Sequence, residues 1–470
     1  MKTIATEKIS TIALVLLITG AIDSIRNLPA TALFGSSLIF FFIFSAIVFL
    51  IPVALVSAEL SSTWAHEEGG IYTWVKNAFG NTTAFFTIWL QWINTMVWYP
   101  TILSFIAGTL AYLINPSLAQ NKLYLIFVIL SVFWSLTLIG LSGLHASARF
   151  AGICAIFGMI IPMGLIILLA IIWLILDNPI QIHLNFDSLM PHLSHSQSWV
   201  SLTAIMTSFL GMELACVHVN QVRDPQKNFP KAMFISVLLI LFTMILGSLA
   251  IAFVLPKKDI NLVAGVMQAF SNFFAHYHLS WLLPLLTIML LVGSLGSMIN
   301  WVISPAKGLL MAADQGFLPK YLRHRNKHGV ASRILILQAL LVTFLCGSFL
   351  LVPSVNGIYW FFTDLSTELY MFMYVLMFIA AIRLKSKYKT MHRPFAIPGG
   401  NLGYNIVCLI GLIGCAITIY VGFIPPADSM DMGDTSHYRL LFGGGILTLL
   451  FPAFCIIVIR LFHQIKSRPE

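Results

Sequence analysis

The chain has 470 residues, of which 59% are hydrophobic and only 9% are Asp, Glu, Lys or Arg. A soluble domain carries about 25% charged residues, so this composition excludes a soluble protein and indicates an integral membrane protein in a lipid bilayer. The net charge of +9 predicts no nucleic-acid partner, because most basic residues fall in alternate loops between apolar segments. Such a distribution of positive charge sets membrane topology.

Apolar segments of the length that crosses a bilayer, roughly 20 residues, recur along the whole sequence. They predict an all-α integral membrane protein with one transmembrane domain, 1–470, and membrane-spanning helices at 9–34, 36–62, 82–114, 122–142, 149–176, 196–221, 230–254, 281–312, 331–350, 355–382, 401–424 and 437–464. The segment 255–280 suits a short external helix. Basic clusters at 320–333 and 383–393 place both termini in the cytoplasm, which predicts a multi-pass protein of the cytoplasmic (inner) membrane.

The first apolar segment is interrupted in its middle by Thr19-Gly-Ala-Ile-Asp-Ser-Ile-Arg-Asn-Leu-Pro29. Glycine loosens a helix, and proline removes a backbone donor and restarts one. Ionisable residues at membrane depth indicate a functional site, and a broken helix is tolerated there only beside a cavity or buried in protein. We therefore predict a substrate site that includes Gly20, Ile22, Asp23, Ser24 and Arg26. The alternative is an intact helix on which Asp23 and Arg26 pair along one face.

Within a broken helix, two arrangements satisfy the charges of Asp23 and Arg26. They pair with each other and hold the interruption open, or a substrate separates them, with Asp23 taking its ammonium group and Arg26 its carboxylate. We expect the pair, because three carboxylates in other apolar segments already make the interior acidic, namely Glu213, Asp364 and Glu368.

The sixth apolar segment contains a second such feature, Gly211-Met212-Glu213, in which a carboxylate follows a glycine at membrane depth. The first and sixth helices each open a run of five. Interruptions at matching places in two five-helix halves indicate an inverted-repeat secondary transporter that holds its substrate between the breaks. The first repeat then covers 9–176 and the second 196–382. Two additional helices at 401–464 look like scaffold or a homodimer surface.

Two later segments carry small or acidic residues. Gly293, Gly296 and Ser297 in the eighth helix suit close helix packing. Asp364 and Glu368 in the tenth helix lie one turn apart on one face, where like charges repel. We group these two carboxyl groups with Glu213 as gating or proton-linked residues. The six cysteines lie inside predicted helices without metal-ligand spacing, so we predict neither a metal site nor a cofactor.

Together these residues resemble the amino acid–polyamine–organocation superfamily, and within it the glutamate/GABA antiporters. The matching pieces run through nearly the whole chain: Ile51-Pro-Val, Ser57-Ala-Glu59, Glu67-Glu-Gly-Gly70, Gly211-Met-Glu213, His218-Val-Asn220, Ala264-Gly-Val-Met-Gln268, Trp301 with Pro305, and Pro394-Phe-x-Ile-Pro-Gly-Gly400. The resemblance implies a LeuT-like five-plus-five repeat with helices 1 and 6 discontinuous, and exchange of one amino acid for another or for its amine product. It also implies that Met212 and Glu213 gate the substrate, whose side chain is bounded by Met298, Trp301, Tyr370 and Tyr374.

The sequence departs from the antiporters at several places. Ser297 stands where they carry a glutamate, the charges in the first helix differ, and Asp364 and Glu368 are additional. The antiporters also have a C-terminal extension that plugs the inner mouth, whereas this sequence ends at Glu470. We therefore expect transport at neutral pH, and the departures leave the particular substrate open.

Three functions are compatible with these patterns, and none is enzymatic. The first is an amino-acid antiporter. The second is a proton-coupled amino-acid symporter that uses Asp364, Glu368 or Glu213, although relatives that couple protons through a lysine in the fifth helix differ from this chain, which has Phe150-Ala-Gly-Ile there. The third is an amino-acid sensor that moves no substrate, which the lack of a soluble signalling domain disfavours.

Overall fold

The computed structural model describes residues 9–65, 70–143, 148–191, 199, 202–352, 354–426 and 435–466. Within these ranges the chain is helical, and its one isolated backbone bridge joins Ile9 to Val222. The first three residues of the Glu67-Glu-Gly-Gly70 motif and residues 467–470 lie outside the described residues.

Eleven helical segments in the described part of the chain are long and apolar enough to cross a membrane. They are Thr11–Ala32, Gly35–Thr63, Asn81–Ile114, Lys122–Leu141, Ile153–Ile175, Pro225–Val254, Ser280–Asp314, Ser332–Leu350, Val355–Lys387, Gly400–Gly422 and Thr435–Phe462. Each corresponds to one predicted span. The remaining prediction, 196–221, corresponds to a shorter apolar helical segment, Leu202–Cys216. The protein is therefore a multi-pass membrane protein.

The α-helices are numbered in chain order. Their bounds are α1 (Thr11–Ile22), α2 (Leu28–Ala32), α3 (Leu38–Ser45), α4 (Ile51–Thr63), α5 (Ile71–Phe79), α6 (Asn81–Ile114), α7 (Lys122–Leu141), α8 (Ala148–Ala155), α9 (Ile161–Ile175), α10 (Phe186–Leu189), α11 (Leu202–Thr207), α12 (Pro225–Val254), α13 (Gly265–His276), α14 (Leu283–Asp314), α15 (Ser332–Gly347), α16 (Val355–Lys387), α17 (Gly400–Gly422) and α18 (Thr435–Lys466). Short π-helical turns join α3 to α4 and α8 to α9. The helix expected within 255–280 is confirmed as α13.

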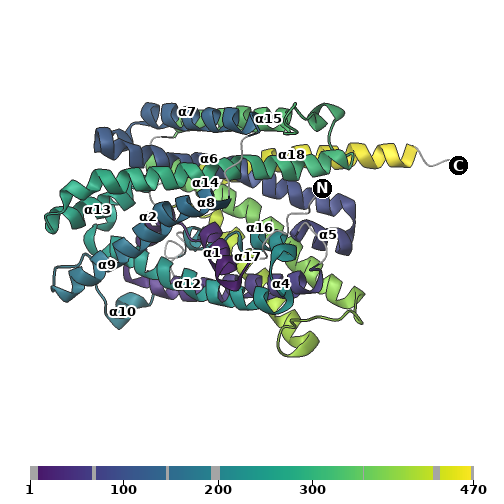
Figure 1. Ribbon diagram of the computed structural model, residues 1–470, viewed down its shortest axis with the longest axis horizontal. Coiled ribbons are helices and arrows are strands. Elements are labelled where there is room, and N and C mark those ends of the chain that lie inside the picture. Colours follow the sequence, from purple (N-terminus) through teal and green to yellow (C-terminus); the bar gives the residue numbers. More distant parts are fainter. Residues whose placement is uncertain are drawn as a thin grey trace.

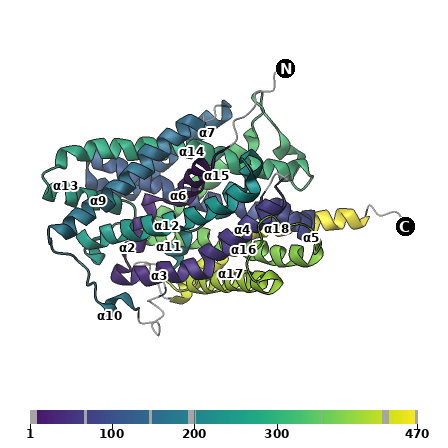
Figure 2. The same cartoon turned by 60° about the horizontal axis from the view of Figure 1, so that its bottom comes forward.

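The core is built around α16, which packs extensively against α6 on one side and α17 on the other. A second group is formed by α12 with α1 and α4, both of which it contacts. The paired helices α7 and α15 lie along one edge, and the end of α18 projects beyond the other helices (Figure 1). Seen from another side, α4 lies beside α17 (Figure 2). The interface between these groups is where the charged residues of the first segment lie.

The predicted close packing at Gly293 is confirmed. A Cβ atom on Gly293 would lie 2.1 Å from the Cα atom of Gly158, so α14 crosses the π-helical turn after α8 with backbone against backbone. Small residues at such crossings let helices approach closely in membranes. Any larger residue at either position would force the two segments apart.

A buried ionic cluster joins α4 to the end of α16 and to the connection before α17. The carboxylate of Glu59 is inaccessible to solvent and lies 2.7 Å from both Lys385 Nζ and Arg393 Nη1. Its second oxygen accepts a hydrogen bond of 2.8 Å from the backbone N–H of Ile397. Two sequence pieces that are far apart in the chain, Ser57-Ala-Glu59 and the Pro394–Gly400 segment, are therefore parts of one contact.

We expect Glu59→Ala to destabilise the fold strongly, because the change leaves two largely buried cations without their shared carboxylate. Removing one partner of a buried ion pair typically costs about 3–5 kcal/mol. The matched control is Asp314→Asn, which breaks the Arg325–Asp314 pair, whose side chains are 53% and 44% exposed, and such surface pairs contribute about 0–1 kcal/mol. Thermal inactivation in detergent measures both changes, and equal effects of the two substitutions would contradict this account.

Candidate functional site

The chain between α1 and α2 is not continuously helical. Helix α1 ends at Ile22, and Asp23 and Ser24 adopt extended backbone conformations. A short 3₁₀ turn, Ile25–Asn27, then leads into α2, whose first turn contains Pro29. The two extended residues turn the charged side chains on either side of them in different directions.

Asp23 lies against α12. Its side chain is buried, and Oδ2 accepts a hydrogen bond of 2.7 Å from the Thr243 hydroxyl. The other carboxylate oxygen, Oδ1, has no hydrogen-bond partner within the described part of the chain. One oxygen of this carboxylate is therefore available to a further donor.

Arg26 lies against α6 instead. Its Nη1 donates to the Thr101 hydroxyl at 3.0 Å, and its guanidinium carbon lies 4.9 Å from the ring centroid of Trp98. The Tyr359 hydroxyl of α16 lies beside the same guanidinium group. Only 6% of Arg26 is exposed, and Nε lacks a hydrogen-bond partner among the described residues.

The expected Asp23–Arg26 ion pair is wrong. The two side chains bind groups on different helices, and they are not among the ion pairs of the described residues, which require a nitrogen–oxygen distance within 4.0 Å. The reason is local: three-residue spacing brings side chains together only on an intact helix. Here Asp23 and Ser24 are extended, so the spacing no longer places the charges on one face.

The chain after α11 contains the second predicted feature. Helix α11 ends at Thr207, Gly211 has φ +105°, and Met212–Gln221 form a 3₁₀ helix. A positive φ of this kind is accessible to glycine without steric cost. A Cβ atom on Gly211 would lie 3.9 Å from Ile22 Cγ1, so this turn is next to the end of α1.

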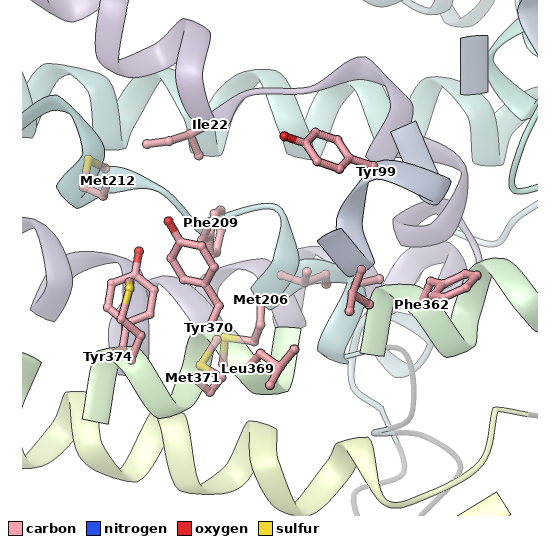
Figure 3. Packing of buried hydrophobic residues seen from close by; sticks show 14 of the residues in the cluster. Ile22, Tyr99, Met206, Phe209, Met212, Phe362, Leu369, Tyr370, Met371 and Tyr374 are labelled. Atoms are coloured by element: carbon pink, nitrogen blue, oxygen red, sulfur yellow. The ribbon is translucent and has the colours of Figure 1, made fainter. Parts of the chain in front are cut away.

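Two tyrosines of α16 hold the carboxylate that follows this turn. Glu213 Oε1 accepts a hydrogen bond of 2.7 Å from Tyr370, and Oε2 accepts one from Tyr374. The Tyr374 hydroxyl in turn accepts from the backbone N–H of Gly211 at 3.0 Å. Figure 3 shows both tyrosines projecting from α16 toward the segment that carries Met212. These contacts bring together four of the predicted site residues.

The remaining predicted site residues divide into two groups. Met212 and Met298 are fully buried, and the Trp301 ring centroid lies 5.2 Å from that of Trp98, which contacts Arg26. Gly20 is exposed and Ser24 partly exposed, and a Cβ atom on Gly20 would lie 3.9 Å from Met159 Cε rather than next to the tyrosine cluster.

The structure does not bring Asp364 and Glu368 to Glu213. A step of two residues turns an α-helix by about 200°, so Glu368 and Tyr370 point to nearly opposite sides of α16. Asp364 accepts hydrogen bonds from Thr203 of α11 and Tyr438 of α18. Gly422 of α17 lies close to Glu368. The two C-terminal helices, expected to be scaffold or a homodimer surface, therefore contribute directly to the surroundings of these carboxyl groups.

Sequence reasoning missed three residues that contact Asp23 or Arg26, namely Thr101, Thr243 and Tyr359. Tyr359 could have been predicted from its spacing. It lies eleven residues before Tyr370, close to three helical turns, and therefore on the same face of α16. Nothing in the sequence marks the two threonines, because threonine is common in membrane helices, where its hydroxyl donates to a carbonyl of the preceding turn. Thr243 also makes this local hydrogen bond, to the carbonyl of Leu239.

Buried charges beside interrupted helices in a multi-pass membrane protein are typical of transporters. A family model described as amino acid permease matches residues 9–451. The chain belongs to this amino acid permease family, and it is a transporter rather than an enzyme. The resemblance to the amino acid–polyamine–organocation superfamily is thereby confirmed.

Individual relatives carry more specific names. An uncharacterised transporter of Legionella pneumophila is 40% identical over 433 residues, which cover 92% of this chain and 93% of the relative. A glutamate/gamma-aminobutyrate antiporter of Lactococcus lactis is 30% identical over 440 residues, 93% of this chain and 87% of the relative. A probable agmatine/putrescine antiporter of the same species is 23% identical over 421 residues, 89% of this chain and 88% of the relative.

Proposed function

We propose that this chain is an amino-acid antiporter of the cytoplasmic membrane with both termini in the cytoplasm. Its fold would be a LeuT-like five-plus-five inverted repeat in which helices 1 and 6 are discontinuous. The observation that carries the proposal is the adjacency of the two interrupted segments, together with the hydrogen bonds from Tyr370 and Tyr374 to Glu213. Inverted-repeat transporters bind substrate at the membrane midplane between two such segments.

The polar groups around the first interruption suit the ammonium group and the side-chain carboxylate of an acidic amino acid. Asp23 Oδ1 is buried and has a free acceptor position for a substrate ammonium group, and the Arg26 guanidinium is a cation that no carboxylate of the described chain neutralises. Charge-assisted hydrogen bonds of this kind are about twice as strong as neutral ones. Trp301, Met298 and the tyrosines of α16 would then bound the substrate side chain.

Glu213 supplies the gate in this proposal. Its carboxylate joins the turn at Gly211 to α16 through two tyrosine hydroxyl groups. Opening the site requires movement of this turn relative to α16, and so requires these bonds to break or rearrange. Exchange rather than net uptake is favoured by the relatives, two of which are named as antiporters.

Counterflow in proteoliposomes tests the proposal. Purified protein is reconstituted at pH 7 with internal glutamate, GABA or alanine, and uptake of the same labelled compound is followed. An antiporter requires substrate on both sides, so we expect uptake only in loaded vesicles. Uptake into empty vesicles driven by a proton gradient would support a symporter instead, and binding without uptake under either condition would support a sensor.

A further inference from the structure

Two buried carboxyl groups on α16 have no role in the substrate site described above. Asp364 Oδ1 accepts a hydrogen bond of 2.6 Å from Thr203, and Oδ2 accepts one of 3.1 Å from Tyr438. Glu368, one helical turn later, is fully buried, and neither of its carboxylate oxygens has a hydrogen-bond partner within the described ranges. A carboxylate that is both buried and unpartnered is the least stable form of this side chain.

The described residues around Glu368 offer no compensating charge. From α17, Gly422 approaches so closely that a Cβ atom there would lie 2.1 Å from Glu368 Oε1, and Cys415 lies nearby. From α18 comes the Tyr438 hydroxyl, and Asp364 lies one turn before Glu368 on α16 itself. The neighbouring α11 presents the hydroxyl groups of Thr203 and Thr207. The three ion pairs of the described chain lie elsewhere, at Glu59 and at Asp314.

Two negative charges cannot both persist in this arrangement. Burying one ion in a low-dielectric interior costs several kcal/mol even after relaxation, and a second like charge one turn away adds repulsion. At least one positive charge must therefore come from solution. A metal cation needs several ligands at once, and the described residues contain no group of three or more His, Cys, Asp or Glu side chains that could hold one. A proton needs only one carboxyl oxygen.

We propose that Asp364 and Glu368 form a proton-binding site, and that loading this site is a step of the transport cycle separate from substrate binding. The inference rests on the proposed antiporter function. In this step a proton from water binds a carboxylate oxygen of Glu368 and makes the group neutral. It returns to water when the cycle exposes the site again, and no other bond is made or broken.

The hydrogen bonds between α11 and α16 link this site to the substrate gate. Asp364 binds Thr203 at the start of α11, Thr367 binds Thr207 at its end, and Tyr374 binds the backbone of Gly211 beyond it. The segment that leads into the turn at Gly211 is thus attached to the carboxyl pair at one end and to the Glu213 cluster at the other. Charged acceptors form stronger hydrogen bonds than neutral ones. The charge on the Asp364–Glu368 pair therefore changes the strength of the hydrogen bonding between α16 and α11.

The experiment combines two measurements on the full-length protein. The first is homoexchange of labelled GABA in proteoliposomes in sodium-free choline buffer, with equal pH on both sides, from about pH 5.5 to about pH 8.5, a range in which GABA keeps its ionisation. The second is the infrared absorption of protonated carboxyl groups in the purified protein. The variants are Glu368→Gln and Asp364→Asn, and Asp314→Asn applies the same kind of change to an exposed carboxylate.

We expect wild-type exchange to change about tenfold across this range, since the loading of one proton site changes by up to about tenfold per pH unit. Glu368→Gln should retain exchange but vary less than about twofold with pH, and should lose part of the protonated-carboxyl band. Asp314→Asn should match wild type in both respects. Gly422→Ala crowds Glu368 and should shift the dependence of exchange on pH relative to wild type. It serves as the second variant if Glu368→Gln fails to fold.

Several results would overturn the inference. One is a wild-type pH profile and infrared band in both Glu368→Gln and Asp364→Asn. Another is pH-independent wild-type exchange, and a third is an absolute requirement for sodium, which would assign the site to a metal cation. Absence of wild-type exchange at every pH would refute the antiporter function instead, and the infrared comparison would still decide whether Glu368 binds a proton.

Discussion

Glu213→Ala should remove most exchange while leaving a protein that folds in detergent. The substitution removes the two hydrogen bonds from the tyrosines that end on Glu213 and keeps the one from the Gly211 N–H to Tyr374, so the turn is held less firmly against α16. Each buried O–H group left without an acceptor costs about 1–3 kcal/mol, so we expect a loss of exchange of at least about tenfold. Initial rates of homoexchange and the elution profile in size-exclusion chromatography measure the two properties.

Glu213→Gln is the matched variant, because it keeps the side-chain volume and one acceptor oxygen but removes the charge. If the gate needs only the hydrogen bonds, this variant should retain more exchange than Glu213→Ala. If the gate needs the charge, both variants should be equally impaired. Exchange by Glu213→Ala at the wild-type rate would end the proposal that this carboxylate gates the site.

Arg26→Ala should weaken the binding of substrates that carry a second carboxylate far more than the binding of substrates without one. The structure separates Arg26 from Asp23, so the guanidinium group is available to a substrate anion. A hydrogen bond to a charged group contributes about 1.5–3 kcal/mol. We therefore expect about a tenfold to hundredfold rise in the apparent KM for glutamate, with a smaller change for GABA and alanine. Asp23→Asn should instead raise the apparent KM for all three compounds, because each carries an ammonium group.

The control is Thr101→Val, which removes a neighbour that accepts from Arg26 but leaves the cation in place. It should change KM for glutamate much less than Arg26→Ala. The double variant Asp23→Asn with Arg26→Gln provides the opposite test. Recovery of activity in this double variant, after equal loss for all substrates in the single variants, would show that the two residues act as a pair in the working protein.

Much of the architecture follows from local properties of the sequence. The long apolar segments predict the membrane helices because each must be apolar over roughly 20 residues to cross a bilayer, and eleven of the predicted spans correspond to long helices. Glycine, proline and charge within the first segment mark the place where α1 ends. Gly211 likewise marks the turn with positive φ before Glu213. These features depend on residues close together in the chain.

Partners of the polar residues did not follow from the sequence in the same way. The spacing of Asp23 and Arg26 suggested an ion pair, but extended backbone between them sends one toward Thr243 and the other toward Thr101 and Trp98. Asp364 and Glu368 were grouped with Glu213 because all three are acidic. Their positions around α16 direct them to different neighbours.

By itself, the sequence determined that this protein crosses the membrane many times and that its first and sixth apolar segments contain unusual polar groups. Only the tertiary structure decided that Tyr370 and Tyr374 bind Glu213. It also decided that, among the described residues, Arg26 has no carboxylate partner and Glu368 has no hydrogen bond. The physical reason is range. Hydropathy and backbone preference act over a few residues, whereas a buried polar side chain is satisfied by whichever helix packs against it.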